Sequence, residues 1–577
     1  MCGITAYFGE GNAGEILMES LKRLEYRGYD SAGIAVLSNP GLEVRKDVGE
    51  VDEINKKINL EEMGGDIAIG HCRWGTHGEV TRENAHPHKS CDGRFALVHN
   101  GIIQNWEELK GGMEGHHFTS ETDSEVIAHF IEEEAKNREV EEAIQKFLEV
   151  AKGSFAVSLL DSDEEKIYAF KRGSPLALGV GDGELYLGSD LYAFSPYTNQ
   201  AVFFEDDEYA VIDAKNYVFK DKEGAVVDKS PEEFSWEQEE SDRKEFEHYM
   251  LKEVKEIPRP LKNLDRSLKG EQKERVENFA GKLADSDRVI FTASGTSYHA
   301  SLLGVYFLQK VDIEAQTLIA SEFKNYERVD ENTLVVPVSQ SGETKDVLEV
   351  IEHSRSKGAE IASITNVPHS TIERKSDVNL RIKAGQEVCV AATKTFTNQL
   401  YTFLKILEAL DGPEISPTLP EEVGTVVQEN EGKVKKLAEE LKDKEDIYVI
   451  GKGETYPVAR EIALKLKEIA YIHAEGMMGG ELKHGTLALI EDGTPVISLI
   501  PREGSGIVSN VEEVEARGAN SIKISPFCGR FKLPQRTDGD FAFFSTVIGF
   551  LLTYWTARKK DLPIDKPRNL AKSVTVR

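Results

Sequence analysis

Arg288-Val-Ile-Phe-Thr-Ala-Ser-Gly-Thr-Ser297 is an apolar run that passes into a turn of small and hydroxyl-bearing residues. This pattern predicts a buried strand and a turn, and a helical pattern comes next. Asp446-Ile-Tyr-Val-Ile-Gly-Lys-Gly-Glu-Thr455 has the same character and begins 158 residues later. These two stretches decide the fold of the second half of the chain, because each predicts the first strand and helix of an α/β domain.

Further features recur at nearly the same spacing. A predicted strand at 334–338 is matched by one at 495–500, and a helix ending at Gly358-Ala359 is matched by one ending at Gly518-Ala519. A near-constant offset indicates an internal duplication. Because strands alternate with helices, each copy is predicted to be an α/β domain with a doubly wound parallel sheet. Ligands of such sheets bind at the carboxyl ends of the strands.

The first part of the chain has a different organisation. Short apolar runs and amphipathic patterns predict an α+β layered domain. We expect strands at 33–37, 67–70, 95–98, 155–160 and 184–187, and helices at 15–25 and 124–134, with Gly28 as a C-cap glycine. A charged stretch then separates the two parts. The domains are expected at 2–225, 246–412 and 413–577, with an acidic linker at 226–245.

Composition limits the kind of protein. The 577 residues carry a formal net charge of −31, and such a surface repels phosphate backbones and anionic membrane surfaces. Nucleic-acid and membrane partners are therefore not expected. The longest apolar run, 541–557, contains four serine and threonine residues and is predicted to be a buried core helix. The N-terminus shows no secretory signal, so we expect a cytoplasmic protein.

The cysteines give no sign of a metal site. The chain has five, they are widely scattered, and none forms a Cys-x-x-Cys pair. Neither a disulfide framework nor a metal site is predicted, and no cofactor is expected.

Cys2 is a candidate nucleophile. Removal of Met1 would leave Cys2 with a free α-amino group, and Gly3 would leave that terminus unhindered. An α-amine with a pKa of about 7.7–8 can take the thiol proton and later return it. Without further context an incidental cysteine would be the better interpretation.

Four further motifs supply that context. They are Glu25-Tyr-Arg-Gly-Tyr-Asp-Ser-Ala-Gly, Arg73-Trp-Gly-Thr-His-Gly, His99-Asn-Gly and Thr122-Asp123. Together with Cys2-Gly-Ile they resemble the class II (N-terminal-nucleophile) glutamine amidotransferases over about residues 2–225.

This resemblance implies a role for each matching position. Cys2 would attack the glutamine amide, and the Asn100 side chain and the Gly101 N–H would stabilise the oxyanion. Arg73 would bind the α-carboxylate of glutamine and Asp123 its α-ammonium group. Trp74, Thr76 and His77 would contribute to glutamine binding and Arg27 to the architecture of the site. His86 and His88 are treated as structural, because a His-Pro-His loop alone indicates no function.

Two hydroxyl-rich turns follow adjacent predicted strands in the second half. Ser294-Gly-Thr-Ser297 and Ser339-Gln-Ser-Gly-Glu-Thr344 can each form an anion cradle at a helix N-terminus, although ordinary helix capping explains either turn alone. No Walker-type lysine is present, so a small phosphate ester suits the turns better than a nucleoside triphosphate. With the duplication, they resemble sugar isomerase (SIS) domains over about residues 280–577.

The predicted helix at 456–471 carries charges on one face. Glu461, Lys465 and Glu468 fall at i, i+4 and i+7, which on an arbitrary helix would indicate a solvated ion-pair stripe. Here His473-Ala-Glu, Gly480-Glu-Leu-Lys-His-Gly485 and a C-terminal Arg568-Asn-Leu-Ala-Lys-Ser-Val-Thr-Val accompany it. These segments resemble the glutamine–fructose-6-phosphate aminotransferase (isomerizing) family, the glucosamine-6-phosphate synthases, and the match then runs from Cys2 to the C-terminus.

That resemblance implies a transfer of the glutamine amide nitrogen to fructose 6-phosphate, followed by isomerisation to glucosamine 6-phosphate. His484 would open the sugar ring, Lys572 would form a Schiff base, and Glu468 would move a proton, with Lys465 and Glu461 positioning that base. The implied sugar-phosphate contacts are Thr296, Ser297, Ser339, Gln340, Ser341, Thr344, Val390 and Ala391.

The resemblance also implies an assembly. Ammonia would need a closed channel between the two sites, gated at Trp74, and His484 would serve the neighbouring subunit of a homodimer. Because the sugar substrate is an anion, we expect the negative charge to lie mostly away from its pocket. Three positions depart from the usual family pattern, namely Gly75, Ser294 and Ala392, and none of them is a predicted catalytic group.

Two alternatives remain on the sequence alone. One is another class II amidotransferase, such as the phosphoribosyl type, and the tandem SIS half argues against it. The other is a sugar-phosphate sensor with a vestigial catalytic half, although no DNA-reading helix or basic patch is evident.

Overall fold

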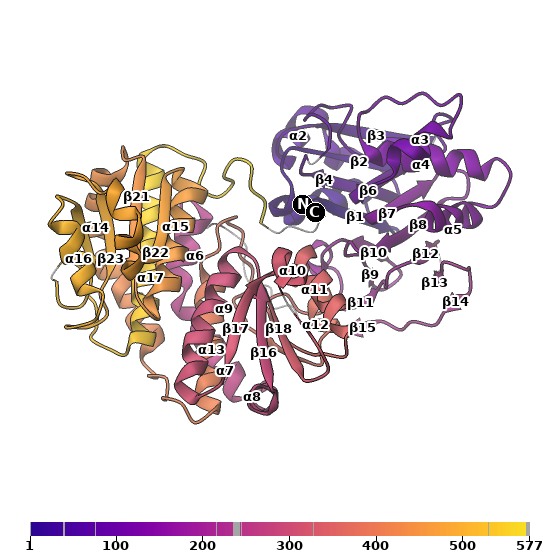
Figure 1. Cartoon of the computed structure of the whole chain (residues 1–577). Helices are drawn as coiled ribbons and strands as arrows, with labels where there is room; N and C mark the ends of the chain where they lie inside the picture. Colours follow the sequence, from indigo (N-terminus) through magenta and orange to yellow (C-terminus); the bar gives the residue numbers. More distant parts are fainter. Residues whose placement is uncertain are drawn as a thin grey trace. The chain divides into compact units, whose positions relative to one another are not determined.

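The computed structural model describes residues 2–38, 41–75, 77–214, 216–234, 243, 245–326, 328–528 and 530–572. The chain forms two compact units (Figure 1). Unit 1 consists of Met1–Gln238 with Ala571–Arg577, and unit 2 of Glu239–Leu570. Each unit is described by itself below.

Unit 1 contains two antiparallel sheets. The first has the order β15-β11-β9-β10-β1-β4-β2-β3, and the second has the order β14-β13-β12-β8-β7-β6-β5. The strands of the first are β1 (Gly3–Phe8), β2 (Ser31–Ser38), β3 (Gly41–Val48), β4 (Ile67–Arg73), β9 (Ala177–Val180), β10 (Leu185–Gly188), β11 (Gln200–Phe203) and β15 (Glu232–Glu233). Those of the second are β5 (His88–Lys89), β6 (Phe95–Ile103), β7 (Gly153–Asp161), β8 (Lys166–Arg172), β12 (Glu208–Ile212), β13 (Tyr217–Asp221) and β14 (Val226–Val227).

The two sheets pack face to face, with helices on their outer faces. Along β1, Ile4 and Ala6 point into the core between the sheets with Val98 of β6, whereas Tyr7 points to the opposite face. This alternation is the period of a strand buried on both sides. The helices and short 3₁₀ turns are α1 (Ala13–Leu24), η1 (Glu25–Arg27), α2 (Val51–Ile58), η2 (Leu60–Glu62), α3 (Trp106–Gly111), α4 (Asp123–Ala135), α5 (Val140–Val150) and η3 (Leu191–Ala193). The layered α+β fold predicted for this half is confirmed.

Two local predictions for unit 1 need correction. Gly28 follows η1 rather than α1 and has an extended backbone (φ −170°), so it is not a left-handed C-cap. The predicted linker also begins too early, because β14 and β15 pair with β13 and β11 and Phe234 is buried. Residues 226–234 therefore belong to unit 1, and of the rest of the expected linker 235–242 and 244 lie outside the described residues.

Unit 2 contains two parallel sheets, β17-β16-β18-β19-β20 and β22-β21-β23-β24. The strands are β16 (Arg288–Ala293), β17 (Ala315–Ile319), β18 (Thr333–Ser339), β19 (Glu360–Thr365), β20 (Val378–Arg381), β21 (Asp446–Gly451), β22 (His473–Met478), β23 (Pro495–Leu499) and β24 (Asn520–Ile524). The longer helices are α6 (Tyr249–Glu256), α7 (Pro258–Lys269), α8 (Lys273–Asp285), α9 (Gly295–Leu308), α11 (Lys345–Arg355), α13 (Lys394–Ala409), α14 (Leu419–Leu441), α15 (Thr455–Ala470), α16 (Val508–Glu515) and α17 (Asp538–Lys559). Short elements complete it: η4 (Gln309–Val311), η5 (Ala320–Glu322), α10 (Phe323–Tyr326), α12 (Thr371–Arg374), η6 (Gly479–His484) and η7 (Thr486–Leu489).

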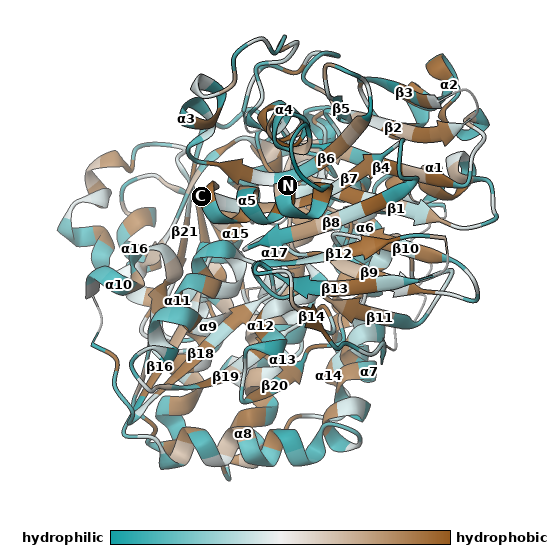
Figure 2. Ribbon diagram, turned by 90° about the vertical axis from the view of Figure 1, so that its right-hand side faces the viewer, coloured by the Kyte–Doolittle hydropathy of each residue, from teal (hydrophilic) through white to brown (hydrophobic). Residues whose placement is uncertain are grey.

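Both sheets of unit 2 are covered on two faces, as doubly wound sheets require. Along β16, Val289 and Phe291 enter one core and Ile290 enters another on the opposite face. Along β21, Ile447 joins that first core, whereas Tyr448 packs on the far side. One core is thus shared by both sheets. Helix α8 carries mixed teal and brown along its length, as expected of a helix with one face on a sheet (Figure 2).

The matched features of the two halves of unit 2 have the same geometry. Gly358 and Gly518 each follow a helix, α11 and α16, and each has φ +86°. A positive φ is what favours glycine at the end of a helix. Both parallel sheets therefore confirm the fold class that the repeated stretches predicted.

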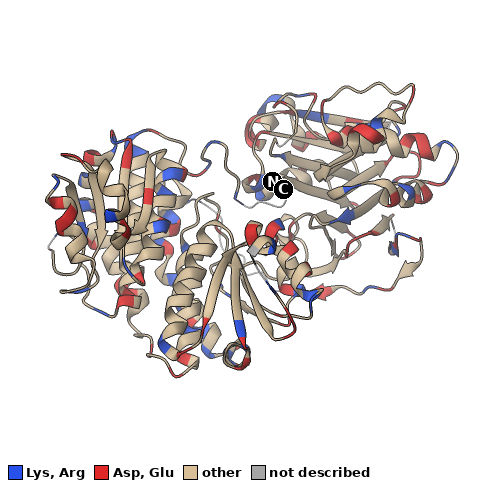
Figure 3. Ribbon diagram, viewed as in Figure 1, with Lys and Arg blue, Asp and Glu red and all other residues tan. Residues whose placement is uncertain are grey.

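Among the described residues, α17 is the one helix whose length and composition would allow it to cross a membrane. However, 94% of the most apolar stretch of this helix is buried within the protein, as expected of a core helix. Charged residues instead lie mostly on outer helices and loops, and β16 to β18 are largely free of them (Figure 3).

Candidate active sites

Cys2 lies immediately before β1 and beside the end of β4. Its Sγ accepts a hydrogen bond from the Trp74 N–H at 3.3 Å and lies 3.5 Å from the Trp74 carbonyl oxygen. The residue is half-buried, whereas Cys72 on the adjacent strand is fully buried. Burial raises the pKa of the Cys72 thiol far above its usual range, so that residue stays protonated. Of these two neighbouring cysteines, Cys2 is the accessible one.

The Asn100 side chain is held next to Cys2. Its Nδ2 donates to the Cys2 carbonyl oxygen at 3.0 Å, and its Oδ1 lies 3.1 Å from Nε2 of His71. The same His71 nitrogen lies 3.0 Å from the His99 carbonyl oxygen, so both of its neighbours are acceptors and it must carry the proton. Burial lowers the pKa of His71 to about 3, which keeps the ring neutral at physiological pH. His71 therefore orients the Asn100 amide.

Gly101 has a backbone that no other residue fits. Its φ is +123°, and an added Cβ would lie 2.0 Å from the carbonyl oxygen of Ser154 on the paired strand β7. Glycine is required here by both the dihedral angle and the close approach. The close approach of β7 therefore fixes a glycine next to Asn100, at the place where the oxyanion donors are predicted.

Arg73 is a buried cation that lacks a carboxylate partner among the described residues. Only 3% of it is exposed, and its guanidinium donates to the carbonyls of His77, Gly78 and Glu79. Burial lowers its pKa, partly offset by the charges of Cys2, Asp30 and Asp123. Since buried charges are normally paired, this guanidinium is suited to an anionic ligand.

Asp123 is the first residue of α4 and is also buried. Its Oδ2 accepts from the Ile103 N–H at 2.7 Å, which fixes the carboxylate at the end of β6. Trp74 packs edge-to-face on Tyr29 and His77 on Trp106, with ring centroids 5.2 and 5.4 Å apart. Thr76, the remaining predicted glutamine contact, lies outside the described residues.

Several supporting residues in unit 1 were missed or only partly foreseen. Asp30 accepts from the Gly75 N–H at 2.8 Å and holds the turn after Arg73, yet no spacing in the sequence indicates this pair. Arg27 forms a buried ion pair with Asp190 at 2.7 Å and so joins η1 to η3, in line with its expected architectural role. His86 stacks on His71 at 4.1 Å and packs against His88, contacts that suit structural histidines.

In unit 2 the charged face of α15 is buried rather than solvated. Glu461 and Lys465 have no exposed surface, and Lys465 Nζ lies 3.2 Å from Glu461 and 2.6 Å from Glu468. The Glu468 side chain is 21% exposed, so it is the end of the network that a ligand can reach. Burial opposes the charge on Lys465, but the two glutamates outweigh it and raise its pKa.

His299 of α9 completes this network, and nothing in its sequence context pointed to it. Its Nδ1 lies 2.8 Å from Glu461, whose pKa stays low because Lys465 and His299 outweigh the effect of burial. Thr296 bridges the network, since its hydroxyl donates to Glu461 and accepts from Lys465, both at 3.0 Å. Ser297 is turned elsewhere and accepts from Gln399 at 2.9 Å.

The turn after β18 forms a compact cradle before α11. The Ser339 hydroxyl accepts from the Gly342 N–H at 3.1 Å and lies 2.9 Å from the Thr344 hydroxyl. At Gly342 φ is +67°, and an added Cβ would lie 2.0 Å from Ser370 Oγ, so only glycine allows this turn. Gln340 and Ser341 are half-buried beside it.

Val390 and Ala391 lie in a segment held by two buried carboxylates. Glu253 accepts from the N–H groups of Val388 and Cys389, and Glu387 accepts from Thr393 and Thr395 at the start of α13. Both glutamates are almost fully buried, and no motif or spacing indicates their role. The segment is therefore preformed, with Ala391 buried and Val390 partly exposed.

The structure does not bring together all the predicted sugar-site residues. His484 is exposed at the end of η6, and among the described residues no hydrogen bond joins it to the α15 network. Lys572 falls in the tail that groups with unit 1. The places of His484 and Lys572 in a sugar site stay predictions.

Comparison with known proteins agrees with this arrangement. Residues 76–196 match the glutamine amidotransferase domain family, and residues 282–409 and 440–526 both match the SIS domain family. The chain is thus an amidotransferase domain followed by SIS domains. The glutamine–fructose-6-phosphate aminotransferases (isomerizing) of Thermococcus kodakarensis and Staphylococcus epidermidis are 43% and 39% identical to it, with all of each chain covered.

A solved structure supports the second half separately. The C-terminal domain of glucosamine-fructose-6-phosphate aminotransferase from Francisella tularensis is 30% identical, covers 57% of this chain and 100% of its own, and has a TM-score of 0.51. The chain belongs to the family of glutamine–fructose-6-phosphate aminotransferases (isomerizing).

Proposed function

We propose that this enzyme converts L-glutamine and fructose 6-phosphate into glutamate and glucosamine 6-phosphate. The network of Glu461, Lys465 and Glu468 carries the proposal, because it presents one reachable carboxylate at the end of a buried, charge-balanced array. A carboxylate of this kind is suited to proton transfer between neighbouring carbons of a sugar. Neither a phosphoribosyl-type amidotransferase nor a sensor would need it.

In the first half-reaction, the thiolate of Cys2 attacks the side-chain amide carbon of glutamine. The α-amine of Cys2, free once Met1 is removed, takes the thiol proton and returns it to the leaving ammonia. Asn100 and the Gly101 N–H stabilise the oxyanion. Arg73 binds the α-carboxylate and Asp123 the α-ammonium group, with Trp74, Thr76 and His77 closing the glutamine site. Water then hydrolyses the thioester to glutamate.

In the second half-reaction, His484 opens the sugar ring, and the amine of Lys572 condenses with the C2 carbonyl to a Schiff base with loss of one water. Ammonia displaces the lysine, and Glu468 moves a proton from C1 to C2. The phosphate is held by Ser339, Gln340, Ser341 and Thr344, and Thr296, Ser297, Val390 and Ala391 line the sugar site. The hydroxyl hydrogen of Thr296 already serves Glu461, so we assign Thr296 to positioning the network rather than donating to the sugar.

The path of the C-terminal tail supports the role of Lys572. The Arg568 N–H donates to the Tyr471 hydroxyl at 2.8 Å, and its guanidinium lies 4.3 Å from the centre of that ring. Tyr471 directly follows α15, three residues after Glu468. Four residues of chain span at most about 14 Å, so Lys572 is tethered within reach of the α15 end.

The same proposal includes the setting of the enzyme. Ammonia passes between the two sites through a closed channel gated by Trp74, because free ammonia would be protonated and lost in water. We propose a cytoplasmic homodimer in which His484 serves the partner's sugar site, without a nucleic-acid or membrane partner.

The test is to incubate the purified enzyme with L-glutamine and fructose 6-phosphate and to measure glutamate and glucosamine 6-phosphate separately. Lys572→Ala is expected to abolish amino-sugar formation while glutamate release continues, and Cys2→Ala is expected to abolish both glutamine-dependent products. Lys560→Ala, after α17, is the matched lysine control. An unchanged amino-sugar yield in Lys572→Ala would refute the assignment, and no amino sugar from the unaltered enzyme would refute the function.

A further inference from the structure

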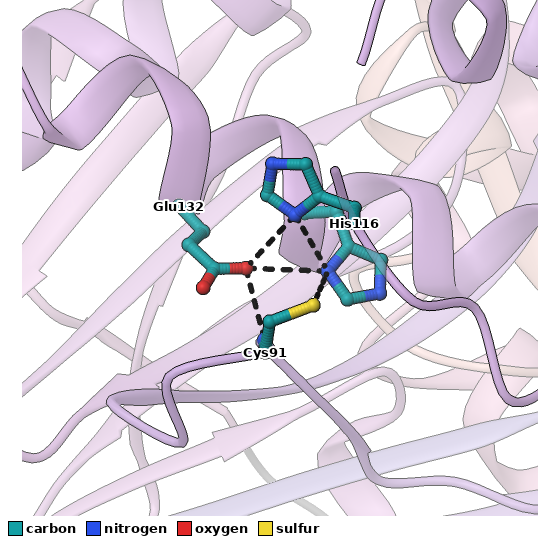
Figure 4. Close-up of side chains that lie close together, drawn as sticks. Cys91, His116 and Glu132 are labelled. Carbon is teal, nitrogen blue, oxygen red and sulfur yellow. Dashed lines mark hydrogen bonds and ion pairs between the residues drawn. The ribbon is translucent and has the colours of Figure 1, made fainter. Parts of the chain in front are cut away.

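Four potential metal ligands that the proposed reaction does not use converge on one face of unit 1. Cys91 lies in the turn between β5 and β6, and His116 in the segment between α3 and α4. His129 and Glu132 occupy positions i and i+3 of α4. Figure 4 shows Cys91, His116 and Glu132 pointing toward a common centre. The scattered cysteines did not indicate a metal site, and this cluster was not predicted from the sequence.

Four of the six separations between the ligand atoms match those of a tetrahedral site. His116 Nδ1, His129 Nδ1 and Glu132 Oε2 form a nearly equilateral triangle, with sides of 3.3, 3.2 and 3.2 Å. Cys91 Sγ lies 3.6 Å from His129 Nδ1, and all four atoms lie within 4.8 Å of one another. Tetrahedral zinc with bonds of about 2.0–2.1 Å to nitrogen and oxygen and about 2.3 Å to sulfur spaces its ligands by about 3.3 and about 3.6 Å.

Hydrogen bonding alone does not explain this set. Two ring nitrogens that face each other can share only one proton, and the His129 nitrogen also faces a carboxylate and a thiol. A divalent cation satisfies all four lone pairs together. A thiolate and a carboxylate would balance its charge, and two neutral imidazoles would complete the site.

The surroundings of the ligands also suit a metal. The outer nitrogen of His116 lies 2.9 Å from Glu133, which is the carboxylate–histidine pair found behind zinc ligands, and that of His129 faces Glu125 at 3.6 Å, beyond hydrogen-bond distance. Glu132 is fixed by the N–H groups of Cys91 and Asp92 at 2.9 and 2.8 Å. His129 and Glu132 are buried whereas Cys91 is exposed, so the ligands are ordered and the site has an entry path.

We propose that Cys91, His116, His129 and Glu132 form a structural zinc site. Because the protein supplies all four ligands, no position remains for a substrate, and the ion has no part in the reaction. It would tie the 90–93 turn and the 112–122 segment to α4, whose first residue is Asp123. The four ligands come from three separate segments of the chain, so their positions follow no short motif.

The test is metal analysis of the full chain, purified without a histidine tag or chelator after growth with added zinc. About one zinc ion per chain is expected, and Cys91→Ser and His116→Gln should lower that content strongly. Cys528→Ser, which removes another exposed cysteine, is the control and should keep the ion. Glu133→Gln should weaken zinc binding about tenfold through the outer carboxylate.

Cobalt substitution identifies the ligands even if a variant folds poorly. The unaltered chain loaded with Co²⁺ should show the visible bands of tetrahedral cobalt and a thiolate charge-transfer band, and Cys91→Ser should lose the latter. Chelation should lower the Tm of unit 1 in the unaltered chain but not in Cys91→Ser. The proposal is overturned if the zinc-grown chain holds no stoichiometric metal, or if Cys91→Ser retains zinc and the thiolate band.

Discussion

The Nε2 of His71 lies 3.1 Å from the Oδ1 of Asn100, and this contact decides which way the Asn100 amide faces. With its oxygen taken by His71, the amide turns its nitrogen toward Cys2, where it donates to the main-chain carbonyl at 3.0 Å. An amide turned the other way would present an oxygen to a developing oxyanion and repel it. We therefore assign His71 as a positioning residue of the glutaminase site.

His71→Leu is expected to lower kcat for glutamine hydrolysis by about tenfold or more, with little change in KM, because the oxyanion donor is misaligned while glutamine contacts persist. Asn100→Ala removes the donor itself and should cost about 10²–10³-fold in kcat. His71→Gln, which can still donate to the Asn100 oxygen, should recover part of the loss. A rise in KM alone in His71→Leu would contradict the positioning role.

Arg73→Lys tests the buried cation. A lysine keeps the charge but loses the planar pair of donors that matches a carboxylate. We expect KM for glutamine to rise by about tenfold or more while kcat changes little, since the lost interaction binds the ground state and the transition state alike. A glutamine analogue without the α-carboxylate should bind both proteins equally weakly. The assignment would be contradicted if the unaltered enzyme bound that analogue much more tightly than the Arg73→Lys variant does.

Glu468→Gln and Lys465→Met separate catalysis from stability in the α15 network. The partly exposed Glu468 can be replaced at little cost in folding, so amino-sugar formation should be lost while Tm stays near its original value. Lys465→Met instead leaves the fully buried Glu461 without its cation, and should destabilise unit 2 by about 3–5 kcal/mol. Calorimetry measures the Tm of both variants, and assays of glutamate and amino sugar measure their activities. Equal loss of stability in both would show that Glu468 is merely structural.

The catalytic candidates could be predicted where neighbouring residues in sequence are also neighbours in space. The helical spacing of Glu461, Lys465 and Glu468 places them on one face, and the structure joins them within 3.2 Å. The buried strands that begin at Arg288 and Asp446 could also be predicted, because parallel strands covered on both faces are continuously apolar. The parallel sheets of unit 2 and the shared face of α15 therefore followed from local patterns, whereas the catalytic roles on that face came from the family resemblance.

Residues that support the sites could not be found in this way. His71 meets Asn100 because β4 and β6 face each other across the interior of unit 1, and Asp30 meets Gly75 because β2 pairs with β4. Glu387 folds back on its own segment to bind Thr393 and Thr395. The four proposed zinc ligands come from three segments. None of these contacts has a fixed spacing, so each depends on tertiary packing rather than on periodicity.

Acidification is expected to destabilise unit 1 through its buried histidines. Burial lowers the pKa of His71 to about 3 and holds the pKa values of His86, His88 and His99 below their usual range. The unfolded chain therefore binds more protons than the folded one below about pH 6.5, and stability falls as the pH drops, by about 1.4 kcal/mol per pH unit for each such group. Calorimetry between about pH 7.5 and about pH 5 should show the Tm of unit 1 falling, and His88→Gln should reduce that slope. His473→Gln, at an exposed histidine of unit 2, should leave it unchanged. A Tm of unit 1 that does not fall with pH would mean that these histidines are already protonated in the folded protein.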